Sequence, residues 1–222
     1  MDRSSRRLFD ANVALEKEKL RTENLLYNVL PQEVAERIRA GATVADPFSD
    51  AAVIFVDLVG SSSLAKSLSP KHFVEVLNKV FSLADRCATE HNVEKVKKIG
   101  DAYLAVAGTA VATDRNAGVN FAKSLVSQVR ILAEELNLDL HVRVGIHNGP
   151  VIGGVIGETR MAYDYWGDTM NIAARVQHCA QISGECVTEQ TYFATRQVHI
   201  YSDARLVMLK GLGQIKVYDL IM

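Results

Sequence analysis

Two acidic residues stand where strands or turns are expected to end. Asp57 follows the apolar, β-branched run AAVIFV, and Asp101 lies beside the turn of VKKIGDAYLAV. Ends of this kind at one edge of a sheet can converge, and two converging carboxylates repel each other unless a cation lies between them. Their oxygens suit Mg²⁺ or Mn²⁺, and Mg²⁺ often shares its shell with phosphate. One such Asp alone is more often a turn or capping residue, so only the pair indicates a metal site.

A second group of polar residues could hold a phosphate and a sugar. In MAYDYWGDTMNIAARVQHCA, Asn171 and Arg175 are four residues apart on an expected helix, so they share a face. An Arg with an Asn one turn earlier can bind a phosphate and a ring oxygen together, although such a pair also occurs on ordinary helix surfaces. The Gly- and Ser-rich segment LVGSSSLAK enters another helix, where free N–H groups suit either phosphate or simple capping.

Strands and helices that alternate along the chain must position these residues. The expected order is a strand ending at Asp57, a helix over SPKHFVEVLNKVFSLADRCATEH, and a hairpin at Gly100 with apolar side chains along both arms. A second helix over TDRNAGVNFAKSLVSQVRILAEELN follows, and then two strands in LHVRVGIHNGPVIGGVIG, joined at Asn148-Gly149-Pro150. This order predicts an α+β fold with helices packed on one face of a mostly antiparallel sheet.

The first 44 residues differ in character from the rest. They are charged and predict a helix until Pro31, after which PQEVAERIRAG restarts a helix that ends before Gly41. Two competing heptad registers predict a short parallel coiled coil, with a solvated helix docked on its own domain as the alternative. One register uses Leu8, Ala11, Leu15, Glu18, Thr22, Leu25 and Val29, and the other uses Phe9, Val13, Leu20, Tyr27 and Leu30.

Composition argues against several classes of protein. The 222 residues are 48% hydrophobic and 23% charged with a net charge of -1, so no basic excess suggests a nucleic-acid partner. The three cysteines lack metal-site spacing and fit a reducing compartment. No apolar run is long enough to span a bilayer and no signal peptide is visible, so we expect a cytoplasmic location. The basic start MDRSSRR would also suit the cytosolic part of a membrane-anchored protein.

Three spaced motifs resemble those of the class III nucleotidyl cyclases. The family carries F-x-D-I-x-G-F-T-x-L, K-x-K-x-I-G-D-x-Y and Y-D-x-W-G-x-T-x-N-x-A-x-R, and this chain reads FVDLVGSSSL, KVKKIGDAY and YDYWGDTMNIAAR in the same order. The resemblance implies a ferredoxin-like βαββαβ catalytic domain over residues 45–222, preceded by an N-terminal helical linker over residues 1–44. One departure is Ser61-Ser62 in place of the family's Phe-Thr, which bears on nucleotide affinity and on the order of the loop.

The resemblance also implies roles by position. Asp57 and Asp101 match the pair that binds two Mg²⁺ or Mn²⁺ ions, with the Leu58 carbonyl as a further ligand. Asn171 and Arg175 match the pair that acts on the transition state. The family works as head-to-tail dimers with active sites between subunits, so a homodimer is expected here.

The base that such a site accepts can be argued from Lys97 and Asp164, which match the family's base-selecting pair. Adenine offers an acceptor at N1 and a donor at its 6-amino group, which complement Lys and Asp, whereas guanine reverses both. The expected activity is therefore that of an adenylate cyclase, with Lys210 in MLKGLG meeting the triphosphate of ATP. The alternatives are a guanylate cyclase, a catalytically silent nucleotide-binding dimerisation module, and a palm-type nucleotidyl transferase.

Overall fold

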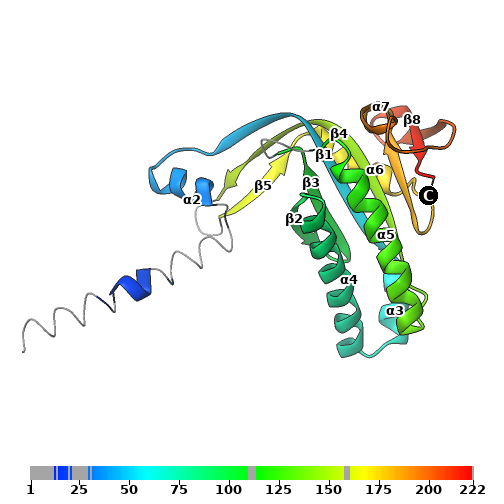
Figure 1. Ribbon diagram of the computed structural model, residues 1–222, viewed down its shortest axis with the longest axis horizontal. Coiled ribbons are helices and arrows are strands. Elements are labelled where there is room, and N and C mark those ends of the chain that lie inside the picture. Colours follow the sequence, from blue (N-terminus) through cyan, green and yellow to red (C-terminus); the bar gives the residue numbers. More distant parts are fainter. Residues whose placement is uncertain are drawn as a thin grey trace, which may run out of the picture. The chain divides into compact units, whose positions relative to one another are not determined.

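The computed structural model describes residues 13, 15–19, 21, 30, 32–109, 114–157 and 161–221. The chain divides into two compact units (Figure 1). The first contains residues 1–46 and 153–164, and the second contains residues 47–152 and 165–222. Each unit is described by itself.

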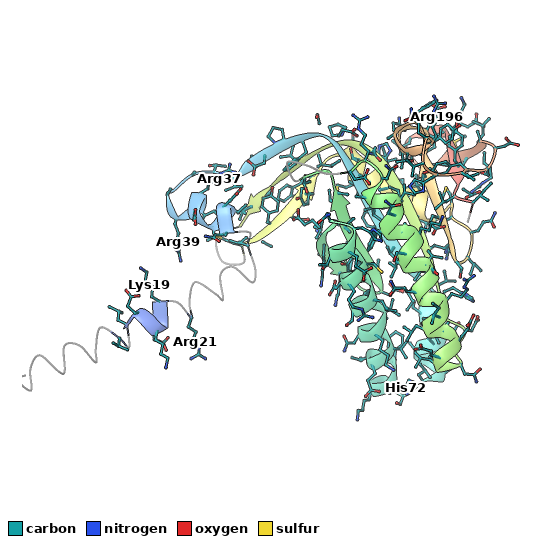
Figure 2. All side chains as sticks on the ribbon, viewed as in Figure 1. Lys19, Arg21, Arg37, Arg39, His72 and Arg196 are labelled. Carbon is teal, nitrogen blue, oxygen red and sulfur yellow. The ribbon has the colours of Figure 1, made fainter. Side chains whose placement is uncertain are left out.

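The first unit is built around helix α2 (Gln32–Arg39). The helix buries Val34 and Ala35 in a small apolar cluster with Leu30 and Val44. Figure 2 shows Arg37 and Arg39 on this helix, and Arg37 donates to Asp46 at 2.8 Å. The predicted helix between Pro31 and Gly41 is confirmed, and Gly41 has the left-handed φ of 77° that suits a residue just past a helix end.

Most of the predicted coiled-coil seam lies outside the described residues. Of the two registers, the structure describes the surroundings of Val13, Leu15, Glu18 and Leu30. Val13 is 50% exposed and Leu15 is 69% exposed, whereas Leu30 is 2% exposed within the cluster of α2. The coiled coil therefore stays a prediction, and Leu30 already packs against its own chain.

One eight-stranded sheet organises the fold, with the strand order β2-β3-β1-β4-β6-β8-β7 and with β5 paired to β4. Strands β4 and β6 pair in parallel, whereas β1·β3, β2·β3, β6·β8 and β7·β8 pair antiparallel. The mostly antiparallel sheet is thus confirmed. The strands are β1 (Ala45–Val59), β2 (Glu94–Ile99), β3 (Ala102–Ala107), β4 (His141–Ile156), β5 (Ala162–Trp166), β6 (Gly184–Thr188), β7 (Arg205–Leu209) and β8 (Gly213–Asp219).

Two long helices of the second unit, α4 (Pro70–Glu90) and α5 (Ala117–Leu136), run side by side over one face of the sheet (Figure 1). The Ser69 side chain caps α4 by accepting from the His72 N–H at 3.3 Å, and Pro70 suits the first turn because it has no N–H to satisfy. The apolar stripes of both helices join the inward residues of β1, β3 and β4 in the main core. Both predicted helices are confirmed, and shorter helices α3 (Ser61–Ser67) and α7 (Glu189–Thr195) complete this unit with α6 (Asp168–Gln177).

Helix α6 packs on the opposite face of the sheet, which differs from the prediction of helices on one face. In β6, Val187 belongs to the main core, whereas the preceding Cys186 belongs to a second cluster with Val176 of α6 and Val217 of β8. Successive strand residues point to opposite faces, so these central strands are apolar on both sides and need cover on both. The candidate site lies on the face that α6 covers, opposite to α4 and α5.

The segment LHVRVGIHNGPVIGGVIG forms one continuous strand, β4, so the predicted turn at Asn148-Gly149-Pro150 is wrong. Neighbouring elements hold Asn148 in the strand: its N–H donates to Thr191 Oγ1 at 3.0 Å, and its side-chain amide donates to Asp50 at 3.2 Å. Gly149 serves close packing instead of a turn, because a Cβ there would lie 2.7 Å from Thr169 Oγ1.

The predicted hairpin of β2 and β3 is confirmed, with Gly100 at a left-handed φ of 64° in its turn. The expectation of apolar packing along both arms is wrong for β2, which is exposed at five of its six positions, whereas β3 is buried at five of six. An edge strand has one neighbour only, and β2 carries lysines that suit such a place.

Candidate functional site

The two acids of the predicted metal site meet where β1 lies beside the hairpin. Asp57 of β1 is paired with Ala102 of β3, and Asp101 directly precedes Ala102 in the turn. Both acids are partly buried. Burial and the negative charge of Asp101 raise the pKa of the Asp57 carboxyl, while the charges of Arg143 and His178 oppose that rise. The like-charge interaction shows that the two carboxylates are neighbours in the folded chain.

Ser61 contacts this acid pair directly. Its Oγ donates to Asp101 Oδ2, and it begins α3 after Gly60, whose φ of 75° is left-handed. Ser61 stands where the family motif has Phe. The departure therefore replaces an aromatic side chain with a hydroxyl that holds one of the two acids.

Gln177 holds the other acid, and sequence reasoning missed it. Its Nε2 donates to Asp57 Oδ2 at 3.3 Å, and the residue is 4% exposed at the end of α6. Helix α6 reaches the sheet there because Gly145 of β4 has no side chain: a Cβ on Gly145 would lie 2.1 Å from the Gln177 nitrogen. A glycine inside an apolar strand pattern was the available signal of this close approach.

The lysines of β2 divide between the two faces of the sheet. Lys95 forms an ion pair with Asp85 of α4 at 2.8 Å, and Lys98 lies 4.6 Å from the centre of the Phe81 ring. A register shift between Lys95 and Lys97 allows both of these lysines to face α4. Because neighbouring strand residues alternate, Lys97 takes the opposite face, which is also the face of Asp57.

The predicted phosphate-binding residues gather around α6. The helix begins after Gly167 and carries Asn171, which is exposed, and Arg175, which is partly buried. Arg175 Nη1 lies 3.6 Å from the position that a Cβ on Gly211 would occupy, and Gly211 follows Lys210 in the turn after β7. The structure therefore brings Arg175 next to the turn that carries Lys210.

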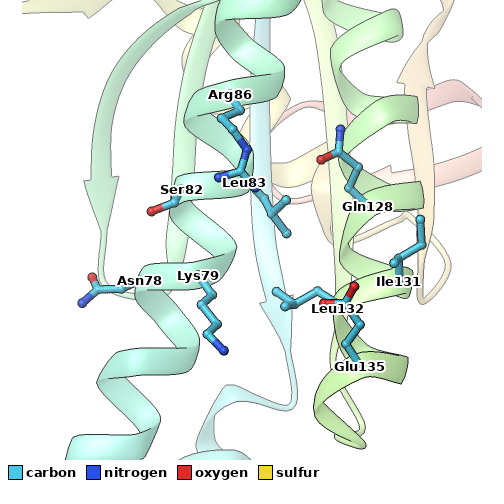
Figure 3. Close-up of a pocket in the computed structure, with 9 residues that line it drawn as sticks. All are labelled: Asn78, Lys79, Ser82, Leu83, Arg86, Gln128, Ile131, Leu132 and Glu135. Carbon is cyan, nitrogen blue, oxygen red and sulfur yellow. The ribbon is translucent and has the colours of Figure 1, made fainter.

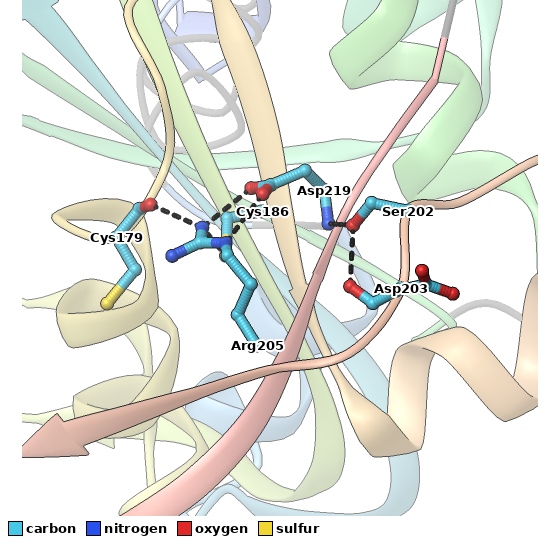
Figure 4. Close-up of polar contacts among 6 residues, drawn as sticks. All are labelled: Cys179, Cys186, Ser202, Asp203, Arg205 and Asp219. Carbon is cyan, nitrogen blue, oxygen red and sulfur yellow. Dashed lines mark hydrogen bonds and ion pairs between the residues drawn. The ribbon is translucent and has the colours of Figure 1, made fainter.

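Arg205 links the hairpin of β7 and β8 to the segment that follows α6 (Figure 4). Arg205 of β7 donates to both carboxylate oxygens of Asp219, at 2.7 and 2.8 Å, and to the Cys179 carbonyl at 2.9 Å. The Asp219 N–H donates to Ser202 Oγ at 3.0 Å. The bidentate pair joins β7 to β8, and the hydrogen bond to Cys179 joins both strands to the segment after α6.

The two remaining predicted residues have different surroundings. Leu58 has a side chain in the main core, 4% exposed, and its carbonyl as a metal ligand stays a prediction. Asp164 lies on β5 and is partly exposed, and it belongs to the first unit, whereas the other predicted site residues belong to the second.

The acid pair suits a hard divalent cation. The negative charge of Asp101 raises the pKa of the Asp57 carboxyl, and a cation between the two acids would oppose that rise. Oxygen is the donor that Mg²⁺ and Mn²⁺ prefer. Within the described part of the chain, no group of three or more His, Cys, Asp or Glu side chains could hold a metal ion. Two side-chain ligands leave the rest of an octahedral shell to other oxygens, as is usual for Mg²⁺.

A groove of about 460 Å³ lies elsewhere, between α4 and α5 (Figure 3). These helices cover the face of the sheet opposite to that of Asp57, so the groove is separate from the acid pair. It is lined by Asn78, Lys79, Ser82, Leu83, Arg86, Gln128, Ile131, Leu132 and Glu135.

Comparison with known proteins places this arrangement in a family. The model of the adenylate and guanylate cyclase catalytic domain matches residues 43–222. The chain therefore belongs to the class III nucleotidyl cyclase family and contains its catalytic domain. Domains of this family generally use divalent metal ions.

Two curated relatives carry different names. An adenylate cyclase of Mycobacterium tuberculosis is 31% identical over 215 residues, and the soluble guanylate cyclase subunit beta-2 of Rattus norvegicus is 36% identical over 227 residues. The matches cover 95% and 97% of this chain but 48% and 32% of the relatives, so the chain spans less than half of their length. None of the described helices is long and apolar enough to cross a membrane.

Solved structures agree on the fold. The guanylate cyclase domain of RhGC from Catenaria anguillulae, in complex with GTP, is 26% identical with a TM-score of 0.75, and the match covers 79% of this chain and 98% of that one. The adenylyl cyclase CyaB from P. aeruginosa, at 21% identity, shares the fold with a TM-score of 0.76 over 80% of this chain and 96% of that one.

Proposed function

We propose that this chain is the catalytic domain of an adenylate cyclase that converts ATP into 3′,5′-cyclic AMP and pyrophosphate. The ribose 3′-oxygen attacks the α-phosphorus and loses its proton, and the bond from the α-phosphorus to the oxygen of the departing pyrophosphate breaks. The observation that carries the proposal is the meeting of Asp57 and Asp101 at one end of β1.

The acid pair is the proposed metal site. Asp57, Asp101 and the Leu58 carbonyl would hold Mg²⁺ or Mn²⁺, with two ions in the complete site. When bound, such ions lower the pKa of the attacking hydroxyl and neutralise phosphate charge. Ser61 and Gln177 each donate to one carboxylate and so restrict its orientation.

The basic residues around α6 are the proposed phosphate site. Arg175 stabilises charge that develops on the α-phosphoryl group, and Asn171 orients the ribose. Lys210 meets the triphosphate, which the closeness of Arg175 to the neighbouring Gly211 supports. A planar guanidinium suits the phosphoryl oxygens because it donates to two of them at once.

Lys97 and Asp164 are the residues proposed to recognise the purine base of the nucleotide. The side of β2 on which Lys97 lies supports this role, since Lys95 and Lys98 are engaged with α4. A mismatched donor or acceptor costs about 1–3 kcal/mol, so two mismatches with guanine imply roughly 10²- to 10⁴-fold discrimination. The 36% identity to a guanylate cyclase subunit favours GTP as the competing substrate.

The proposed active sites lie between two copies of this chain. Asp57 and Asp101 of one subunit would face Lys97, Asp164, Asn171, Arg175 and Lys210 of the other. A two-fold axis then generates two identical composite sites in a homodimer. Domain boundaries at 1–44 and 45–222 belong to the same proposal.

Product analysis tests the substrate assignment. The purified chain is incubated with ATP or GTP and Mn²⁺, and products are separated by chromatography. We expect cyclic AMP, with kcat/KM for ATP roughly 10²- to 10⁴-fold above that for GTP. Preferential formation of cyclic GMP would establish the guanylate cyclase alternative. Nucleotide binding without any cyclic product would identify a silent dimerisation module.

A further inference from the structure

Gln177 is a polar side chain that the protein buries against a proposed metal ligand. It is 4% exposed, and its Nε2 donates to Asp57 Oδ2 at 3.3 Å. A buried amide is retained at a cost unless its hydrogen-bonding groups find partners. The acceptor here is a carboxylate, so the hydrogen bond is charge-assisted whenever Asp57 is ionised.

A close contact between the backbones of α6 and β4 brings Gln177 to Asp57. A Cβ on Gly145 would lie 2.1 Å from the Gln177 nitrogen and 2.4 Å from its Cα, so only glycine lets the end of α6 lie on β4 here. Val144 and Ile146 face the main core, and Gly145 therefore faces the side of the sheet that carries Asp57. The amide reaches Asp57 because the helix end is in direct contact with the sheet.

A second buried donor lies near the same carboxylate. Arg143 precedes Gly145 by two residues in β4, so both face the same side of the sheet. Its charge acts on Asp57, and its buried Nε has no hydrogen-bond partner among the described residues. Gln177 thus donates to one acid of the pair, and the positive charge of Arg143 acts on the same acid.

We propose that Gln177 is a positioning residue that holds the Asp57 carboxylate in the orientation that binds a divalent cation. This inference rests on the proposed function, because it takes Asp57 to be a metal ligand. The hydrogen bond occupies Oδ2 and restricts rotation of the carboxylate, as outer-shell partners do for other metal-binding carboxylates. Loss of the amide leaves the acid free to rotate away.

The position of Gln177 on α6 makes the inference specific. It lies two residues after Arg175, yet it contacts Asp57 of its own chain. In a composite dimer, Arg175 and Asp57 of one chain serve different active sites. Gln177 should therefore affect the site that uses its own chain's Asp57, and not the site that uses its own chain's Arg175.

Direct binding of Mn²⁺ is the first test. Free Mn²⁺ is followed by electron paramagnetic resonance as it is titrated into the full chain with 3′-deoxy-ATP, which cannot cyclise. The variant Gln177→Leu keeps similar bulk without the donor, and we expect its Kd for Mn²⁺ to rise about tenfold. Gln128→Leu is the matched control, since this partly buried amide donates to Ser124 and Cys87 in the groove between α4 and α5.

The outcomes separate this inference from the metal assignment. Unchanged Mn²⁺ affinity in a folded Gln177→Leu protein would overturn the positioning role. If Asp57→Ala binds Mn²⁺ as tightly as the unmodified chain, the metal site itself is wrong. Should Gln177→Leu fail to fold, Gln177→Asn replaces it, because its amide is one methylene shorter and should weaken Mn²⁺ binding in the same direction.

Mixed dimers test which active site Gln177 serves. In a dimer of an Arg175→Ala chain and an Asp57→Ala chain, the surviving site takes Asp57 from the first chain. Gln177→Leu placed in the Arg175→Ala chain should raise the half-saturating Mn²⁺ concentration about tenfold at nearly unchanged kcat. The same change in the Asp57→Ala chain should leave it unaltered. An equal shift from both placements would mean that Gln177 acts through α6 and not through Asp57.

Discussion

Asp57 is the acid of the pair whose ionisation the fold makes less favourable. Asp57 is partly buried beside a like charge, and both features raise the pKa of its carboxyl. The hydrogen bond from Gln177 to Asp57 opposes part of this rise. A carboxyl whose pKa is raised by burial and by a neighbouring like charge is typical of functional sites.

Removing either acid should abolish cyclase activity while the fold survives. We expect Asp57→Ala and Asp101→Ala to lower kcat by roughly 10²- to 10³-fold, because metal stabilisation of charge is worth several kcal/mol. Circular dichroism and the melting temperature should change little, since each substitution also removes a like-charge repulsion. Substantial Mg²⁺-dependent turnover in either variant would contradict the metal assignment.

Exchanging the hydrogen-bond donor at Lys97 and the acceptor at Asp164 should change the preferred nucleotide. Lys97→Glu with Asp164→Cys is expected to move the ratio of kcat/KM from ATP toward GTP, with lower total activity because the pocket is not otherwise repacked. Steady-state kinetics with both nucleotides measures this ratio. Equal loss of both activities in a folded protein would show that these residues do not read the base.

Helix α6 is the element on which the site most depends. It carries Asn171 and Arg175 on one face and Gln177 at its end, and its approach to β4 is permitted by the missing side chain of Gly145. On the other face of the sheet, β6 buries Glu185, which is 1% exposed. The close approach at Gly145 and the burial of Glu185 should both affect the stability of the folded chain.

A methyl group on Gly145 should displace α6. The Cβ of Gly145→Ala would lie 2.1 Å from backbone, so the helix must shift, at a cost of roughly 3 kcal/mol and about 6–12 °C in Tm. Activity should fall further than stability alone explains, since Gln177 moves with the helix. Gly184→Ala is the control, because its Cβ would meet nothing nearer than 3.4 Å. Equal Tm values for the two variants would refute this account of the packing.

The buried Glu185 should make stability decrease with rising pH. Burial raises the pKa of its carboxyl from 4.5 to about 7, and the charge of Lys123 opposes this rise. The folded protein thus holds the proton more tightly than the unfolded chain does. Below pH 4.5, Glu185 makes its full contribution to the free energy of unfolding. As the pH rises through about 7, that contribution of roughly 3 kcal/mol is lost.

Urea unfolding at pH 5 and pH 8 measures this loss. Glu185→Gln cannot ionise, so we expect it to be more stable than the unmodified chain at pH 8 and nearly equal at pH 5. Glu134→Gln, at an exposed position of α5, is the control and should alter neither value. Equal pH dependence in Glu185→Gln and the unmodified chain would exclude Glu185 as the source.

The proposed dimer makes each chain half of two active sites. The acid pair and the basic residues of α6 would work in different sites, so each chain alone should be nearly inert. The N-terminal segment would raise the effective concentration of the two chains if the predicted coiled coil forms. This arrangement predicts complementation between inactive chains.

An Asp57→Ala chain mixed with an Arg175→Ala chain should regain activity. With free exchange, half of the dimers are mixed and each contains one intact site, so roughly a quarter of the activity should return. Cyclic AMP production after mixing measures the recovery, and each variant alone is the control. Failure to complement under proven subunit exchange would rule out composite sites.

Local patterns were sufficient to predict many of the elements and the candidate acids. The long helices α4 and α5 followed from apolar spacing, the hairpin from its glycine, and Asp57 and Asp101 from their places at strand and turn ends. These features depend on neighbours in the chain, which the sequence displays directly. The roles of Lys97, Asp164 and Lys210 came from resemblance to the family, and they stay predictions.

Contacts between distant segments could not be predicted in this way. Asn148-Gly149-Pro150 suggested a turn, but Thr191 and Asp50 accept hydrogen bonds from Asn148 within a continuous strand. The register shift in β2 determines that Lys98, and not Lys97, stacks on Phe81. Gln177 meets Asp57 across 120 positions of the chain because Gly145 lets the helix approach. Each of these depends on how the elements pack, and packing brings together side chains that no local pattern relates.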